Sequence, residues 1–188
     1  MKTIFFVLMI FPIFLSAQEK EIKADFDGDK ILDKVYVDQD NMGIAYELSS
    51  QKFKKVFSEF EDSGEISLDP AKNGFKVNVN HMRAGSSQQF RYEKETGKMR
   101  LIGMNRYEFG PANNDGSGES SVNLLTNEYV AEWNYFDNNK ENLIKIPTIK
   151  KKMIFPKTYF GSLKNEVQTY IDKDVEYYLA AKKRLYKN

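Results

Sequence analysis

The chain has 188 residues, and its 28 basic and 27 acidic side chains give a formal net charge of +1. A chain without a basic excess cannot neutralise a phosphate backbone, so nucleic acid is excluded as the expected partner. The length suits one domain with its own core. Because the sequence contains no cysteine, burial and not disulfide bonding must stabilise that core.

Residues 1–17 have the layout of a secretory signal peptide. Lys2 supplies a positive charge, an apolar run covers 4–15, and small residues follow at 16–17. An uncleaved membrane anchor is the alternative, but the run is shorter than the roughly 20 residues that span a bilayer. We therefore expect an exported protein, periplasmic or secreted, with one domain over 18–188 and no stable membrane insertion after cleavage.

The middle of the chain alternates short apolar segments with turn residues about every 10–15 residues, which indicates an antiparallel β-meander. Strands are expected at 34–37, 44–48, 66–68, 75–79, 89–93, 98–109, 122–125, 129–135 and 143–149. Segment 53–60 fits either a helix face or a bulged strand. Segment 69–74 is expected to be a turn, because it contains Pro70 and Gly74.

The C-terminal residues change to a helical period. Apolar side chains recur with a spacing near 3.6 from residue 163 onward, and Lys182 and Lys183 lie near the end, where cations favour the helix dipole. This pattern predicts one amphipathic helix over 163–185, with Ser162 as its N-cap, packed on the sheet. The expected fold class is therefore mainly β (α+β). A helix lying on a membrane is the alternative, which acidic residues such as Asp172 disfavour.

The loop 25–33 reads DFDGDKILD and is the strongest candidate site. Hard cations need several oxygen ligands at about 2.3–2.6 Å, and alternating aspartates in a tight loop supply them. The expected metal ligands are the side chains of four aspartates and one backbone carbonyl: Asp25, Asp27, Asp29, Asp33 and the carbonyl of Ile31. The expected ion is calcium. The alternative is a loop of Asx turns with solvated carboxylates and no metal.

This loop resembles the calcium loops of FG-GAP/VCBS-type repeats, whose pattern is Asp-x-Asn-Gly-Asp-Gly-x-x-Asp between two strands. The resemblance covers residues 24–37 and implies calcium binding by the loop carboxylates. Asp27 replaces the usual Asn, and Lys30 replaces a Gly that favours a sharp turn. Tyr36 stands at the twelfth position, so the bidentate glutamate of an EF-hand is missing.

A second candidate is the loop 110–120, which is rich in Gly, Asn, Asp and Ser. Long loops in compact domains are usually functional or mobile connectors, and both readings stay open. The candidate ligand-binding residues are Asn113, Asn114, Asp115 and Glu119. Asp115 and Glu119 would be paired carboxylates if the protein were a hydrolase.

His81 is the one histidine of the chain and lies near Ser86 and Ser87. A nucleophilic serine needs an adjacent base, but no nucleophile-elbow pattern surrounds either serine, so an ordinary loop histidine is the main reading. Without cysteine, and with a single histidine, a zinc site is not expected.

The segments 101–103 and 121–126 also resemble secreted proteins of Bacteroidetes-type bacteria, a likeness that implies an envelope location and no particular activity. The sequence therefore favours an exported, non-enzymatic binding module with a structural calcium loop and an unidentified protein or glycan ligand. The alternatives are an inhibitor or immunity-type protein that acts through an exposed surface, and a hydrolase that uses loop carboxylates.

Overall fold

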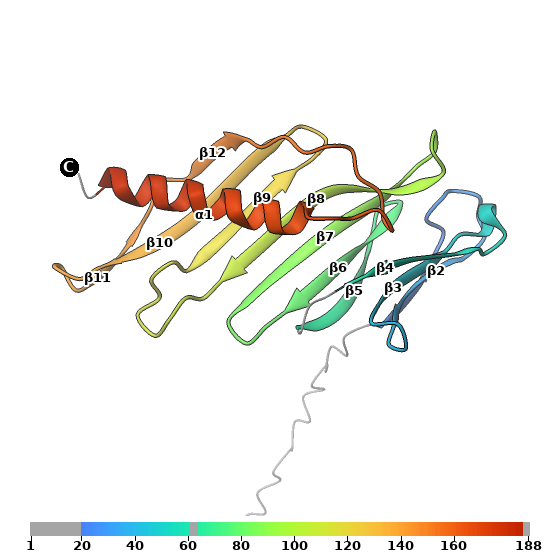
Figure 1. The fold of residues 1–188 in the computed structure, drawn as a ribbon, viewed down its shortest axis with the longest axis horizontal. Helices are drawn as coiled ribbons and strands as arrows, with labels where there is room; N and C mark the ends of the chain where they lie inside the picture. The colour runs from blue at the N-terminus through green and yellow to red at the C-terminus, as the bar shows by residue number, and fades with distance from the viewer. Residues whose placement is uncertain (1–19, 61–63, 186–188) are drawn as a thin grey trace, which may run out of the picture.

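The computed structural model describes residues 20–60 and 64–185. The predicted signal peptide, residues 1–17, lies outside these ranges. The described chain is mostly β, with two antiparallel sheets and one C-terminal helix, which confirms the predicted fold class (Figure 1).

The N-terminal sheet has four strands in the order β1-β2-β3-β4. Its strands are β1 (Glu21–Ala24), β2 (Asp33–Asp38), β3 (Gly43–Glu47) and β4 (Lys55–Glu59). A short 3-10 helix, η1 (Ser49–Gln51), lies between β3 and β4. The segment 53–60, which fitted two readings, thus contains an edge strand.

The larger sheet has the order β11-β10-β9-β8-β7-β6-β5, and β12 also pairs with β10. Its strands are β5 (Glu65–Ala71), β6 (Gly74–Asn80), β7 (Ala84–Glu93), β8 (Lys98–Glu108), β9 (Gly118–Asn123), β10 (Glu128–Asp137), β11 (Asn142–Lys145) and β12 (Ile149–Lys152). Consecutive strands are neighbours through most of the sheet, so the predicted meander is confirmed.

Two proline positions account for the main differences from the predicted strands. Pro70 lies inside β5 and pairs with Phe75, so only residues 72–73 form the turn that was expected over 69–74. β5 is an edge strand, where the missing N–H of proline removes no ladder hydrogen bond. The expected strand 143–149 is instead divided into β11 and β12 around Pro147, because a proline has no N–H with which to continue the ladder.

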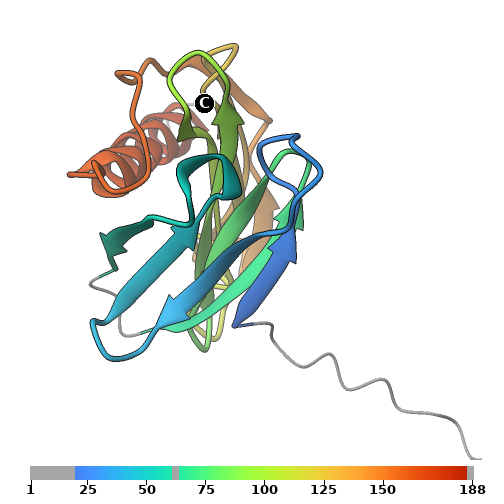
Figure 2. The same ribbon diagram turned by 90° about the vertical axis from the view of Figure 1, so that its right-hand side faces the viewer.

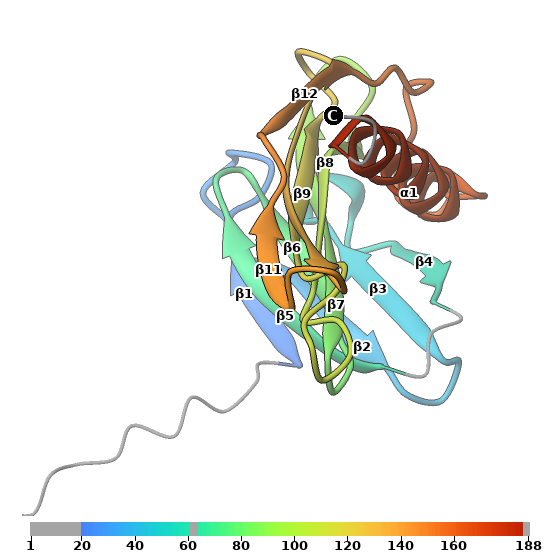
Figure 3. The ribbon, with the colours of Figure 1, turned by 90° about the vertical axis from the view of Figure 1, so that its left-hand side faces the viewer.

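The helix α1 (Glu166–Leu185) lies across one face of the larger sheet, and the β3–β4 side of the smaller sheet lies on that same side (Figures 1 and 3). The predicted start at residue 163 and the Ser162 cap are wrong by about one turn. The backbone carbonyl of Asn165 accepts the N–H of Thr169 at 2.8 Å, and the side chain of Glu166 accepts the N–H of Lys164 at 2.7 Å.

One contiguous apolar core joins both sheets and the helix. Its centre is aromatic: the ring of Phe160 lies 5.2 Å from the rings of both Tyr46 and Phe90, and 5.7 Å from that of Phe75. Tyr46 belongs to β3 and Phe90 to β7, so these edge-to-face contacts hold the smaller sheet against the larger one. This arrangement fixes the position of the loops at the end of the smaller sheet.

Candidate metal centre

The β1–β2 loop turns sharply at two residues with positive φ. Gly28 has φ 87° and Lys30 has φ 70°. The left-handed conformation suits glycine and costs other residues energy, yet Lys30 adopts it where the FG-GAP/VCBS-type pattern has a glycine. The departure from the pattern at Lys30 therefore does not prevent the turn.

The loop carboxylates accept hydrogen bonds from the loop's own backbone. Asp25 accepts the N–H of Gly28 at 2.6 Å and that of Lys30 at 3.0 Å. Asp27 accepts the N–H of Asp29 at 3.2 Å, and Asp29 accepts that of Ile31 at 2.8 Å. These contacts bend the loop around its acidic side chains. One carboxylate oxygen from each of the three aspartates lies within 4.8 Å of the others.

Two serines from η1 donate hydrogen bonds to this acidic group. Ser49 Oγ donates to Asp29 Oδ2, and Ser50 Oγ donates to Asp27 Oδ2, both at 2.6 Å. The hydrogen bond from Ser49 and, next, the N–H of Ile31 lower the pKa of Asp29, so this carboxylate is ionised at neutral pH. The sequence pattern gave no signal for these serines, because Ser49 lies 20 residues from Asp29 and Ser50 lies 23 residues from Asp27.

Asp33 has a different environment from the other three aspartates. It is fully buried, and its Oδ2 accepts the N–H of Phe26 at 2.7 Å and that of Asp27 at 3.3 Å. Its Oδ1 accepts the N–H of Ser49 at 2.8 Å. Asp33 therefore joins both ends of the loop to η1, and the acidic group consists of Asp25, Asp27 and Asp29 without it.

Within residues 20–60 and 64–185, none of the three grouped carboxylates forms an ion pair with a lysine or arginine. Lys34, which follows the loop, pairs with Glu47 instead, at 3.4 Å. Three negative groups at this distance repel one another unless a cation lies between them. The acidic group Asp25, Asp27 and Asp29 could therefore hold a metal ion.

The loop between β8 and β9 does not bring its two predicted carboxylates together. Asp115 accepts the N–H of Phe136 at 2.8 Å and pairs with Lys182 of α1 at 3.0 Å. Burial raises the pKa of Asp115, but the hydrogen bonds from Phe136 and Lys182 outweigh it and lower the pKa overall. Glu119 lies in β9, and the cleft that it lines with Tyr107 does not include Asp115.

The two asparagines of that loop are exposed and mainly shape the backbone. Asn113 Oδ1 accepts the N–H of Asp115 at 3.2 Å, and Asn114 has φ 58°, which asparagine tolerates well. Arg83 donates to the carbonyl of Gly110 at 2.6 Å from the neighbouring β6–β7 turn. The loop is thus tied to α1 through Asp115 and to a neighbouring turn through Arg83.

Neither of the two serines near His81 in the sequence forms a pair with His81 in the described part of the chain. Ser87 Oγ donates to Asn105 Oδ1 at 2.8 Å, and Ser86 lines a cleft beside the first turns of α1 that does not include His81. His81 itself lies exposed in the β6–β7 turn. The geometry gives no serine–histidine pair among these side chains.

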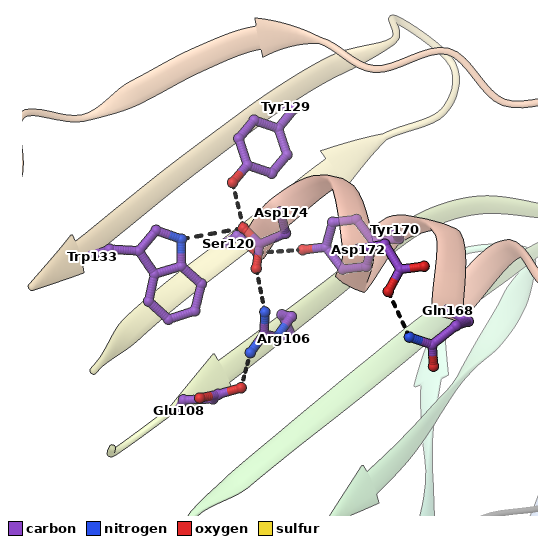
Figure 4. Close-up of polar contacts among 9 residues, drawn as sticks. All are labelled: Arg106, Glu108, Ser120, Tyr129, Trp133, Gln168, Tyr170, Asp172 and Asp174. Atoms are coloured by element: carbon purple, nitrogen blue, oxygen red, sulfur yellow. Dashed lines mark hydrogen bonds and ion pairs between the residues drawn. The ribbon is translucent and has the colours of Figure 1, made fainter. Parts of the chain in front are cut away.

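A buried polar cluster under α1 was not predicted from the sequence (Figure 4). Asp174 of α1 is fully buried and accepts hydrogen bonds from Arg106 of β8 and from Tyr129 and Trp133 of β10. Burial and the bond to Asp174 raise the pKa of the Tyr129 hydroxyl, which stays protonated. Each polar group has a partner, and the cluster attaches the helix to the sheet.

No protein-family model, curated protein or solved structure matches the chain. The acidic group by itself is not diagnostic of a family, so the resemblance of residues 24–37 to FG-GAP/VCBS-type loops stays a prediction. Among the described residues, no helix combines the length and the apolar composition that crossing a bilayer requires.

Proposed function

We propose that the protein is an exported, non-enzymatic binding module whose 25–33 loop takes one calcium ion. The observation that supports this proposal most is the acidic group itself. Asp25, Asp27 and Asp29 each offer one oxygen within 4.8 Å of the others, and no cationic side chain of the described chain neutralises them. In this proposal the protein is periplasmic or secreted, and its binding partner is a protein or a glycan.

The hydrogen bonds within the loop leave room for coordination. An ionised carboxylate has about four lone-pair sites, so an oxygen that accepts an N–H can also bind a metal. The exposed setting of Asp25 and Asp29 leaves further positions for water and for the predicted carbonyl ligand of Ile31. Calcium accepts six to eight oxygens in flexible geometry, whereas magnesium demands a near-ideal octahedron at about 2.0–2.1 Å.

The role of the ion follows from the two serines. Because Ser49 and Ser50 already contact Asp29 and Asp27, an ion between the carboxylates would tie the β1–β2 loop more firmly to η1. An ion that binds only the folded chain stabilises it by RT ln(1 + [Ca]/Kd). At ten times Kd this gain is about 1.4 kcal/mol, which corresponds to a rise in melting temperature of about 3–5 °C for a domain of this size.

The test is calcium titration by calorimetry, together with thermal melting in calcium and in EDTA. We expect one ion per chain, with a dissociation constant on the order of 0.1–1 mM, as in extracellular calcium modules. Asp29→Asn should abolish the heat and the thermal shift. Asp40→Ala, which removes an exposed carboxylate from the β2–β3 turn, is the matched control and should change neither. Absence of both heat and shift in the wild-type protein at millimolar calcium would refute the proposal.

A further inference from the structure

The loops that flank the acidic group form one end of the molecule, defined here by residues 25–33, 48–54, 72–73 and 93–98 and called the loop end. Its turns are linked to one another: Gln51 donates to the carbonyl of Gly97, and the N–H of Tyr92, in β7 just before the 93–98 turn, donates to the carbonyl of Asn73 at 2.8 Å. The β1–β2 and β3–β4 loops lie side by side in Figure 1 and again in Figure 2. The loop end is therefore one continuous surface.

Three large apolar side chains on this surface are exposed to solvent. The exposed fractions are 54% for Ile31, 63% for Leu32 and 49% for Phe53. Ile31 and Leu32 follow the acidic group, and Phe53 follows the η1 serines that contact it. Isolated exposed apolar residues are ordinary, but these three lie on two loops that hydrogen-bond to each other through Ser49 and Ser50. We call these three residues the apolar tip.

Phe53 is exposed at an additional conformational cost. Phe53 and the preceding Lys52 both have φ 56°, in the left-handed region that bulky residues rarely adopt. Residues held in such conformations cluster at ligand-binding and switch regions. The backbone of the turn after η1 is thus strained at Phe53, whose ring is about half exposed. Burial of that ring in an apolar phase would offset this conformational cost.

The formal charge of the loop end would change if calcium bound to the acidic group. The loop end carries six lysines, Lys30, Lys52, Lys54, Lys72, Lys94 and Lys98, all of them exposed. It also carries six carboxylates: Asp25, Asp27, Asp29, Asp33, Glu93 and Glu95. The formal charge is therefore 6 − 6 = 0 without metal. One bound calcium ion would raise it to +2 and would remove the negative potential beside Ile31 and Leu32.

We propose that the loop end docks peripherally on an anionic lipid surface when calcium is bound. The apolar tip would enter the boundary between headgroups and acyl chains, and the lysines and the ion would meet lipid phosphates. This inference rests on the proposed calcium site, which supplies the charge. An apolar tip on a surface that also carries exposed lysines suits a lipid headgroup layer, since a protein interface core is depleted of lysine.

The experiment is vesicle sedimentation with the purified protein, using phosphatidylcholine vesicles with and without phosphatidylglycerol. We expect binding to the anionic vesicles in calcium, and loss of that binding in EDTA or with neutral vesicles. Leu32→Ser should weaken vesicle binding about tenfold, since burial of an exposed leucine side chain in an apolar phase raises the binding constant by about that factor. Phe53→Asn should weaken it similarly, and asparagine tolerates the left-handed backbone, so the fold is preserved.

Met82→Ser is the matched control, because Met82 is 94% exposed in the β6–β7 turn, at the opposite end of the larger sheet. It should leave vesicle binding unchanged.

Calcium calorimetry without lipid separates the two proposals. A protein that binds calcium but not anionic vesicles overturns the docking inference and leaves the calcium site intact. A protein that binds no calcium overturns both. An equal loss of binding in Met82→Ser and Leu32→Ser also overturns the docking inference.

Discussion

Replacing Asp33 with alanine tests the division of roles among the loop aspartates. Asp33 is fully buried and accepts three backbone N–H groups, from Phe26, Asp27 and Ser49. Alanine leaves all three without an acceptor. Hydrogen bonds to a charged group contribute about 1.5–3 kcal/mol each, and two of these three are shorter than 3 Å. We expect Asp33→Ala to lower the free energy of unfolding by about 3–5 kcal/mol.

The assay is urea denaturation of wild type and Asp33→Ala, each in calcium and in EDTA. Because the lost bonds belong to the backbone and not to the metal group, the difference between the two proteins should be the same in both conditions. The Asp33→Ala substitution should also lower the melting temperature by about 10–15 °C for a domain of this size. If Asp33→Ala instead unfolds like wild type in EDTA and differs only in calcium, then Asp33 is a metal ligand and the assigned structural role is wrong.

Three further predictions concern other parts of the chain. Asp174→Ala should lower the free energy of unfolding by about 3–5 kcal/mol in denaturation, because it removes the buried partner of Arg106, which keeps only the partly exposed Glu108, and the acceptor of Tyr129 and Trp133; a change below about 1 kcal/mol would contradict the role of the cluster under α1. Lys30→Gly should stabilise the protein by up to about 1 kcal/mol, since glycine relieves the positive φ; destabilisation would show that the lysine side chain compensates for the turn. Glu93 has its pKa lowered from 4.5 to about 2, first by the hydrogen bond from Lys157 and then by that from Tyr159. Its folded pKa lies below the unfolded value, so its contribution is complete above about pH 4.5 and is lost as the pH falls toward 2. The stability difference between wild type and Glu93→Gln should shrink over that window, and a difference independent of pH would refute the assignment.

The strand pattern could be predicted from the sequence because it depends on neighbouring residues. The hairpin of β7 and β8 could be predicted from the alternation of apolar and polar residues and from Gly97 in the turn, which are neighbours in the sequence. In the structure Gly97 has φ 66°. The prolines were harder to interpret. Pro70 signals a turn in isolation, but the topology places it on an edge strand, where its missing N–H faces no partner. Strand order, not local composition, decided that position.

The acidic group has the same division between local and distant causes. The alternation of Asp25, Asp27 and Asp29 is local, and their hydrogen bonds span two to five residues, so the sequence by itself determined a tight acidic loop. Asp33 belongs to the same pattern by spacing. Its burial and its bond to Ser49, sixteen residues away, place it in the core of the loop and not in the acidic group. Spacing alone cannot distinguish these two environments.

The helix gives the clearest contrast between sequence and tertiary structure. Its apolar period determined that a helix would form and pack on the sheet. What attaches it is Asp174, an acidic residue that the sequence would place in solvent, bound to Arg106 across 68 residues. A buried charge is tolerated only where partners from other elements surround it, and β8 and β10 supply them here. The sequence thus determined the elements and the acidic loop, whereas the tertiary structure decided which carboxylates are buried as anchors and which remain free to bind a cation.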